Sequence, residues 1–348
     1  KLLKEAGYTT GMFGKWGLGA PKSSGDPMNQ GWDEFYGYNC QRQAHTFYPK
    51  HLWHNDKKVM LDGKTYSHDL IQKQALKFIR NNAKKPFFAY LPITIPHAAM
   101  QCPEEDVAPF RKKFPQFEDK IGKYSHGTKV KNPVAAFAGM MTRMDRGVGQ
   151  VLDLLDELNI ADNTLVLFTS DNGPHYEGGH QPGFFNSNGP LKGHKRDLYE
   201  GGIRVPLIVR QPHKAHAGSQ PGDYVCSNDI YPTLLDLAGL PARPGQHADG
   251  RSFRDLLVGA KTRRAPRSLY WHYPHYHGST WSPGAAIRDG DWKLIEFYHH
   301  GKIELYNLKD DIGEQNDLAS IHPDRALALR QRLKSWQKEM GARLPVPR

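Results

Sequence analysis

The sequence predicts an α/β fold followed by a smaller antiparallel sheet with one helix. Three observations support this prediction. Helical and strand patterns alternate through most of the chain, the strands there are short continuous apolar runs, and the pattern changes after about residue 258. Continuously apolar strands are typical of a sheet that helices cover on both faces. We therefore expect an α/β domain over residues 1–258 and a second domain over residues 259–348.

Apolar periodicity and turn residues define the elements of the first domain. A helical start ends at Gly7, and the residues that follow alternate between helical and strand patterns. We expect helices over 69–81, 133–158 and 229–240, and strands over 86–91, 164–169 and 207–209.

The second domain begins with short strand-like runs that Gly-Asp and His-Gly turns separate. We expect an antiparallel meander with strands over 268–273, 285–288, 292–298 and 302–307. A final amphipathic helix over 323–340 should pack its apolar side chains against this sheet; they are Leu327, Leu329, Leu333 and Trp336.

Composition narrows the class of partner. The 348 residues are 38% hydrophobic and 24% charged, which is ordinary for a protein with a buried core. Lys and Arg exceed Asp and Glu by 47 to 36, so the net charge of +11 favours an anionic partner. The basic residues form no nucleic-acid-binding motif, and no apolar run reaches the roughly 18 residues of a membrane span. We expect no nucleic acid and no membrane span.

The cysteines and the first residues carry two further expectations. Cys40, Cys102 and Cys226 form no metal-ligand spacing, so we expect three thiols, with a single disulfide as the alternative. The chain starts with Lys1 inside a helical pattern. We expect it to be the C-terminal part of a longer protein, with any signal peptide upstream.

Polar residues follow the two strongest predicted strands. Residues 94–97 end in His97, and residues 170–175 contain Asp171 and Asn172. Ligands of open α/β sheets bind at the carboxyl ends of strands, and a carboxylate beside an amide oxygen suits Ca²⁺. Asp-Asn-Gly is also a common turn, and His97 could equally be a loop histidine without a catalytic role.

A third, basic and glycine-rich stretch over residues 189–206 completes a pattern that runs through most of the chain. With this stretch the chain resembles the type I sulfatases of the alkaline phosphatase superfamily. The matching motifs are Gly7-Tyr8-Thr9-Thr10 with Gly14-Lys15-Trp16, Pro96-His97, Ser170-Asp171-Asn172-Gly173, Lys195 with residues 200–206, and residues 287–294. Their order and spacing together are specific, although each is weak alone.

The resemblance implies an alkaline-phosphatase-like fold and assigns roles in sulfate-ester hydrolysis. Lys15 and Lys195 resemble the lysines that hold sulfate oxygens, and His97 resembles the histidine that donates a proton to the leaving oxygen. Asp171 and Asn172 resemble two ligands of one Ca²⁺, whose remaining ligands would lie upstream.

The family nucleophile is a formylglycine made from Cys or Ser in a Cys/Ser-x-Pro-x-Arg motif. None of the three cysteines here has this motif, so the resemblance places the nucleophile upstream. It also implies a formylglycine-generating or anaerobic sulfatase-maturing enzyme as a partner. One departure is Gly17, where many members have a histidine. We interpret Gly17 as a subgroup feature, with impaired chemistry as the alternative.

Substrate contacts are expected from two further groups of residues. His175, Glu177 and His180 follow the metal-ligand loop directly. A second group opens the C-terminal domain and contains His272, His275 and His277. A strip that only packs between domains is the alternative for this second group. For Glu200 and Arg204 we favour an ion pair or a loop anchor behind Lys195.

The resemblance implies a sulfuric ester hydrolase that removes sulfate from a sulfated carbohydrate. The residues given should be inactive alone, because the nucleophile and half of the metal ligands would be upstream. A phosphonate or phosphate ester hydrolase of the same superfamily and a catalytically silent binder of sulfated glycans are the alternatives. The resemblance implies a periplasmic or extracellular location.

Overall fold

The computed structural model describes residues 1–259, 264–276 and 281–346. They form two compact units, described here one at a time. Unit 1 comprises Lys1–Val166, Glu177–His180 and Val209–Lys261, and unit 2 comprises Leu167–Tyr176, Gln181–Ile208 and Thr262–Arg348. The division of the chain after residue 258 stays a prediction, because unit 2 also gathers two segments from earlier in the chain.

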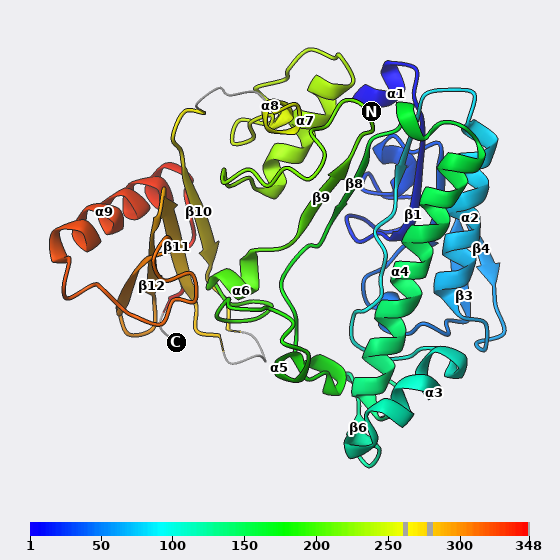
Figure 1. Ribbon diagram of the computed structural model, residues 1–348, viewed down its shortest axis with the longest axis horizontal. Helices are drawn as coiled ribbons and strands as arrows, with labels where there is room; N and C mark the ends of the chain where they lie inside the picture. The colour runs from blue at the N-terminus through cyan, green and yellow to red at the C-terminus, as the bar shows by residue number, and fades with distance from the viewer. Residues whose placement is uncertain (260–263, 277–280, 347–348) are drawn as a thin grey trace. The chain divides into compact units, whose positions relative to one another are not determined.

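A five-stranded mixed sheet lies in unit 1 (Figure 1), with strand order β4-β3-β2-β1-β5. Strands β2, β1 and β5 are parallel, whereas β3 and β4 are antiparallel. The strands are β1 (Thr9–Lys15), β2 (Glu34–Tyr38), β3 (His51–His54), β4 (Lys57–Met60) and β5 (Phe87–Tyr90). The three parallel strands therefore bring their carboxyl ends to one edge.

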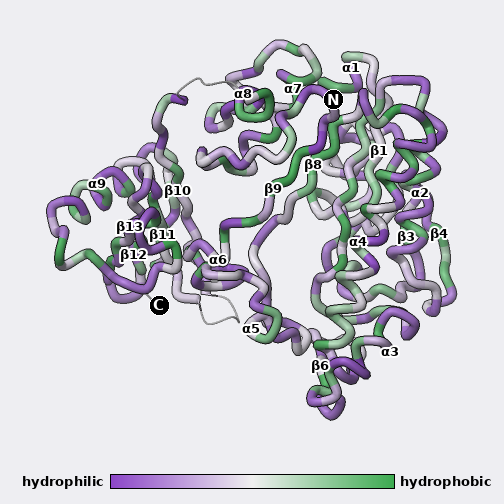
Figure 2. Tube along the Cα trace, viewed as in Figure 1, coloured by the Kyte–Doolittle hydropathy of each residue, from purple (hydrophilic) through white to green (hydrophobic). Residues whose placement is uncertain are grey.

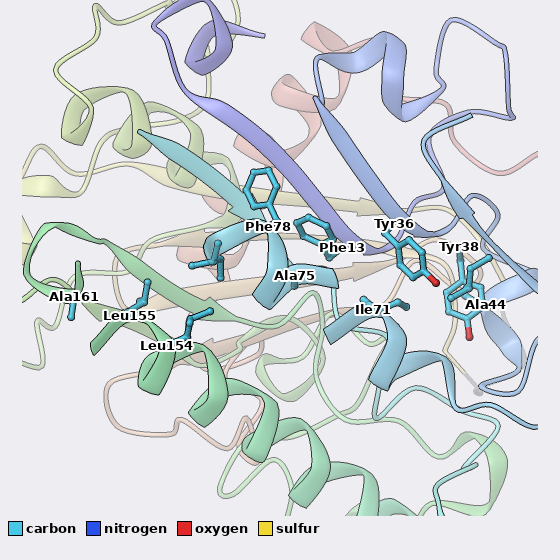
Figure 3. Packing of buried hydrophobic residues seen from close by; sticks show 12 residues of the cluster. Phe13, Tyr36, Tyr38, Ala44, Ile71, Ala75, Phe78, Leu154, Leu155 and Ala161 are labelled. Carbon is cyan, nitrogen blue, oxygen red and sulfur yellow. The ribbon is translucent and has the colours of Figure 1, made fainter. Parts of the chain in front are cut away.

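Two long helices build the core of unit 1. Helix α2 (Ser67–Asn82) packs on β1 and β5, and α4 (Pro133–Glu157) packs on α2. In the buried cluster, the rings of Phe13 and Phe78 lie 5.2 Å apart, and Leu154 and Leu155 belong to the same cluster (Figure 3). Each such side chain contributes roughly 1.5–3 kcal/mol on burial, so this core holds β1 and β5 firmly in place.

Helix α4 starts where the sequence predicts, for a local reason. Asn132 accepts a hydrogen bond from the backbone N–H of Ala135 at 3.0 Å, and Pro133 occupies the first helical position. The remaining helices of unit 1 are α1 (Leu2–Glu5), α3 (Glu104–Lys113), α7 (Ile230–Leu237) and α8 (Arg254–Leu257). Its two-residue strands are β6 (Ile121–Gly122) and β7 (Val130–Lys131).

The chain passes between the units within two paired strands, β8 (Val166–Thr169) and β9 (Leu207–Arg210). The tube of β9 is largely green in Figure 2, in agreement with its predicted apolar character. In the described residues β8 pairs with β9 alone, so the two strongest predicted strands, β5 and β8, belong to different sheets.

Unit 2 contains a four-stranded antiparallel sheet in the order β10-β11-β12-β13. Its strands are β10 (Ser268–Tyr273), β11 (Gly284–Asp289), β12 (Trp292–Phe297) and β13 (Ile303–Asn307), and its helices are α5 (Pro182–Phe185), α6 (Glu200–Ile203) and α9 (Pro323–Glu339). Helix α9 buries Leu329 and Leu333 against the sheet, with Trp336 beside them. The expectation for Leu327 is wrong: it is 54% exposed, and Ala326 is buried instead, because the helical repeat turns residue 327 outward.

The predicted fold class is confirmed as a mixed sheet with helices plus a separate antiparallel sheet with a C-terminal helix. Cys40, Cys102 and Cys226 are thiols, as expected. Among the described helices, none has the length and apolar character that crossing a membrane requires.

Candidate active site

The first set of candidate residues, here called the histidine set, lies in unit 1 and consists of Lys15, His97, Glu177 and His180. Lys15 is the last residue of β1, and its backbone N–H donates to the carbonyl of Pro92 at 3.1 Å. Pro92 follows β5, and His97 stands five residues farther on. Lys15 and His97 therefore lie at the carboxyl ends of the neighbouring parallel strands β1 and β5, at the edge where α/β sheets bind ligands.

The His97 imidazole is oriented by its own loop. Its Nδ1 lies 3.0 Å from the carbonyl oxygen of Ala98. A carbonyl oxygen only accepts, so Nδ1 carries a proton in this contact, and Nε2 is the other ring nitrogen. The next two residues, Ala99 and Met100, have positive φ of 114° and 44°, which is strained for side chains other than glycine. Backbone strain of this kind persists only where surrounding packing enforces it, and it occurs often at functional sites.

The turn that holds Glu177 and His180 packs on the His97 loop. A Cβ built on Gly178 would lie 3.1 Å from Cγ of Met100 and 3.5 Å from Cβ of Ala98. Gly178 has a φ of +68°, so both its conformation and its close packing favour glycine. His180 is buried and stacks on Phe137 of α4, with the ring centroids 3.6 Å apart. This turn is thus a fixed part of the histidine set.

The second set, here called the lysine set, lies in unit 2 and consists of Asp171, Asn172, His175 and Lys195. The first three follow β8 directly, and Lys195 is joined to them through the backbone. The N–H of Lys195 donates to the carbonyl of Pro174 at 2.8 Å, and the N–H of Gly173 donates to Gly202 at 3.0 Å. A Cβ on Gly173 would overlap the carbonyl oxygen of Gly201. The predicted metal loop and lysine loop therefore pack backbone to backbone.

A network of buried charges anchors Glu200, which lies five residues after Lys195. Glu200 accepts from Lys293 at 2.9 Å and from Arg288 at 3.3 Å, and Lys293 also pairs with Glu314 at 2.9 Å. Lys293 and Glu314 are fully buried and Glu200 is 2% exposed. Burial raises the pKa of Glu314, while Lys293 opposes that rise. The backbone N–H of Glu200 donates to Glu314 at 2.6 Å.

These contacts support the loop-anchor interpretation of Glu200, and Arg204 lies 3.8 Å from the same carboxylate. Lys192 has a different role from Lys195. Its ammonium lies 4.2 Å from the ring centroid of Tyr199 and donates to the carbonyl of Glu314 at 3.0 Å. Lys192 is thus part of the packing of unit 2.

The other predicted substrate contacts are placed as follows. His175 is buried, and the next residue, Tyr176, lies against His194 with ring centroids 4.3 Å apart. His272 has a partner at each ring nitrogen, the Tyr298 hydroxyl at 2.6 Å and the Arg343 carbonyl at 3.0 Å. Both partners lie in unit 2, like His272 itself. His275 lies edge-on to Tyr273, and His277 lies outside the described residues.

The donors that could hold a metal are oxygen atoms of the lysine set. Asp171 is exposed, and Asn172 uses its amide nitrogen to donate to the Gly173 carbonyl at 3.2 Å. A carboxylate and an amide oxygen fit Ca²⁺, which takes six to eight oxygen ligands. Within the described ranges no group of three or more His, Cys, Asp or Glu side chains is placed to bind a metal. Asp171 and Asn172 are thus two oxygen donors of the kind that Ca²⁺ takes.

The segment after β2 brings residues that the sequence did not single out. The ring of His45 is stacked on that of His97 at 5.4 Å, and Tyr124 stands edge-on to both.

A Cβ built on Gly17 would lie 2.5 Å from Cγ and 2.8 Å from Nε2 of Gln41. The Gln41 side chain thus occupies the space beside Gly17, and a larger residue at position 17 would displace it. No local motif signals these contacts.

Comparison with known proteins decides the family. Residues 1–240 match the family model described as Sulfatase. The chain belongs to the sulfatase family. Residues 193–339 also match the model described as N-sulphoglucosamine sulphohydrolase, C-terminal, so the two matches together extend over nearly the whole sulfatase chain.

Three sulfatase relatives illustrate the similarity. The chain is 33% identical over 281 residues to a sulfatase of Formosa agariphila, covering 74% of this chain and 47% of the relative. It is 26% identical over 424 residues to an N-acetylglucosamine-6-O-sulfatase of Bacteroides thetaiotaomicron, covering 97% of this chain and 72% of the relative. The crystal structure of Ps i-CgsB in complex with k-i-k-neocarrahexaose has a TM-score of 0.78 at 30% identity, covering 97% of this chain and 73% of that chain.

The chain spans about half the length of the Formosa sulfatase that it matches. Its fold is also similar to that of the phosphonate monoester hydrolase of Agrobacterium radiobacter, with a TM-score of 0.60 at 18% identity, covering 97% of this chain and 79% of that chain. At that identity the likeness concerns the fold alone.

Proposed function

We propose that the full-length protein hydrolyses a sulfate monoester of a carbohydrate. The observation that carries the proposal is the position of Lys15 and His97, which follow neighbouring parallel strands inside the region that matches the sulfatase family. A cation and an imidazole are the groups that charge stabilisation and leaving-group protonation need.

Each residue has a separate part in the proposed reaction. Lys15 and Lys195 are compact cations that stabilise the charge on the nonbridging sulfate oxygens in the transition state. As the bond between sulfur and the bridging oxygen breaks, the sulfuryl group passes to the nucleophile. Protonated His97 gives its Nε2 proton to the bridging oxygen, so that a neutral alcohol leaves and His97 becomes neutral.

Two groups outside the described side chains belong to the proposal. The resemblance to the family supplies a formylglycine nucleophile, matured by a dedicated enzyme, and a calcium ion. Asp171 and Asn172 would contribute oxygen ligands to the ion, which when bound supplies positive charge beside the reacting sulfate. The exposure of Asp171 at the end of β8 supports this assignment.

The proposed substrate is a sulfated carbohydrate. The Ps i-CgsB structure holds k-i-k-neocarrahexaose, and the Bacteroides relative is named for N-acetylglucosamine 6-O-sulfate chemistry. The net charge of +11 supports the recruitment of a polyanionic glycan. For a substrate of this size we propose a periplasmic or extracellular location.

Replacement of Lys195 in the full-length protein tests the function. Lys195→Ala should lower kcat for a sulfated oligosaccharide by on the order of 10² or more, because charge in the transition state loses its partner. Lys77→Ala removes an exposed lysine of α2 and serves as the matched control. Equal turnover of Lys195→Ala and wild type would reject the role of Lys195.

Assays of the full-length wild-type protein also distinguish a sulfatase from a phosphate-type hydrolase and from a silent glycan binder. Faster turnover of phosphate or phosphonate esters than of sulfate esters would indicate a phosphate-type hydrolase. Glycan binding without any sulfate release would indicate a silent binder.

Removal of the proposed ligand Asp171 tests the metal assignment. Asp171→Ala should lose bound calcium together with activity, measured by elemental analysis after dialysis and by turnover. Asp153→Ala, at an exposed position of α4, should keep both. Stoichiometric calcium in Asp171→Ala would contradict the assignment.

A further inference from the structure

Two half-buried rings from separate segments of unit 1, those of His45 and Tyr124, meet the half-buried ring of His97. The ring of His45 lies parallel to that of His97, with 5.4 Å between centroids and 7° between planes. Tyr124 stands nearly perpendicular to both, 5.5 Å from His97 at 87° and 4.9 Å from His45 at 80°. Centroid distances of 4.5–7 Å with offset-stacked or edge-to-face planes are the favourable geometries of ring pairs. The His97 ring is thus bounded by one parallel and one perpendicular neighbour.

The segments that carry His45 and His97 are joined by a shared glutamine. Gln101, four residues after His97, accepts from the backbone N–H of Phe47 at 2.8 Å and from the Thr46 hydroxyl at 3.2 Å. His45 itself stands between Ala44 and Phe47, both fully buried. Displacement of the backbone segment that carries His45 from the loop of His97 would therefore break two hydrogen bonds.

We propose that His45 is a positioning residue for His97: its stacked ring holds the His97 imidazole in the orientation from which Nε2 donates a proton to the leaving oxygen. The inference rests on the proposed function of His97. His45 itself forms no bond to the substrate in this scheme and transfers no proton.

The contacts of His97 act on its ring in different directions. The bond from Nδ1 to the Ala98 carbonyl sets one direction in the plane of the His97 ring. The parallel ring of His45 and the perpendicular ring of Tyr124 pack against the His97 ring and so oppose its rotation about that bond. Proton transfer needs the donor within hydrogen-bond reach of the accepting atom, and general acid catalysis contributes about 10²–10⁴-fold when the geometry is met.

The test compares two sulfate esters in the full-length enzyme. 4-Nitrophenyl sulfate releases a stable phenolate and gains little from an acid, whereas an alkyl or sugar sulfate releases a poor leaving group and depends on protonation. His45→Ala should lower kcat for the sugar sulfate by on the order of 10-fold to 10²-fold and change kcat for 4-nitrophenyl sulfate by less than about 3-fold, a smaller effect because no acid is required there.

Two variants at position 45 and one elsewhere sharpen the result. His45→Phe keeps a stacked ring without ionisable nitrogens and should retain most of the sugar-sulfate activity. His54→Ala removes another half-exposed histidine that lies edge-on to a tyrosine, Tyr36, and should behave as wild type on both esters. If His45→Ala does not fold, which circular dichroism shows, His45→Gln carries the same prediction.

The outcomes distinguish this inference from the proposed function. His97→Ala is measured on the same two esters. If His97→Ala discriminates between them and His45→Ala does not, the positioning role of His45 is wrong while that of His97 stands. If His97→Ala lowers both equally, the proposed role of His97 fails. An equal loss on both esters in His45→Ala, or a His45→Phe variant as poor as His45→Ala, also overturns the inference.

Discussion

The histidine set and the lysine set are held in place by different physics. In unit 1, side-chain rings orient His97, and the loop that carries it has two residues with positive φ. In unit 2, backbone atoms of Gly173, Gly201 and Gly202 touch directly, and the buried charges behind them include Lys293.

This difference predicts how substitutions around the proton donor and around the cation should affect the reaction. A proton donor needs one atom at one angle, and stacked rings define an angle without competing for the proton. A cation on a flexible side chain needs a fixed base, and a rigid backbone supplies it. Changes in unit 1 should therefore alter selectivity among leaving groups, whereas changes in unit 2 should alter stability and overall turnover.

The largest expected effect is the loss of the buried charge in unit 2. Lys293→Ala leaves Glu200 and Glu314 buried without their ammonium partner, which should destabilise the protein by about 3–5 kcal/mol. Urea unfolding measures the change. Arg80→Ala removes an exposed partner of Glu157 and should cost less than about 1 kcal/mol. Similar losses in both variants would show that the charges of unit 2 are not the anchor.

The stability contributed by a buried histidine in unit 1 and by a buried glutamate in unit 2 should change with pH in opposite directions. Burial lowers the pKa of His68 in α2 to about 4, so the folded state binds fewer protons than the unfolded state between pH 6.5 and 4. The corresponding stability is complete above pH 6.5 and is lost as pH falls to 4, by roughly 3 kcal/mol. Burial raises the pKa of Glu314, so its contribution has the opposite sign and declines as pH rises above 4.5.

Unfolding of His68→Gln from pH 7 to pH 4 checks this expectation. The variant should lose less stability on acidification than the wild type, because its side chain does not titrate. Equal pH slopes for the two proteins would contradict the buried neutral state of His68.

The smallest expected effect concerns the glycine contact of the lysine set. Gly173→Ala places a Cβ on the carbonyl of Gly201, which should cost about 1–3 kcal/mol of overpacking. It should also lower turnover of both esters, because the loop of Lys195 must shift. Gly149→Ala in α4, where a Cβ meets nothing within 4 Å, should instead be neutral or stabilising by up to about 1 kcal/mol. Thermal unfolding and kcat measure both variants, and an unaffected Gly173→Ala would contradict the backbone contact.

Apolar periodicity and turn residues are sufficient to predict the long helices and strands. The predicted helix 133–158 is α4 (Pro133–Glu157), and predicted strand 268–273 is β10 (Ser268–Tyr273). The apolar pattern does not predict strand β1, because Gly11 and Gly14 interrupt it. Its buried position depends on partners from distant segments, which no local pattern contains.

The candidate site was predictable where a motif carries it and not where the fold alone assembles it. His97 and Lys195 stand in recognisable stretches, and the structure places each in a constrained loop. His45 and Tyr124 lie 79 positions apart in the chain and meet only because the sheet and α4 bring their segments together. Lys293 belongs to a matched motif, but its partner Glu314 has no sequence signal.

The most direct measurement of the central claim is the dependence of kcat on leaving-group pKa for His97→Ala and Lys195→Ala, across a series of aryl, alkyl and sugar sulfates. The account predicts that His97→Ala loses activity progressively as the leaving group becomes poorer, whereas Lys195→Ala loses a similar factor on every ester. Parallel losses in both variants would contradict the separation of a proton donor held by rings from a cation held by backbone.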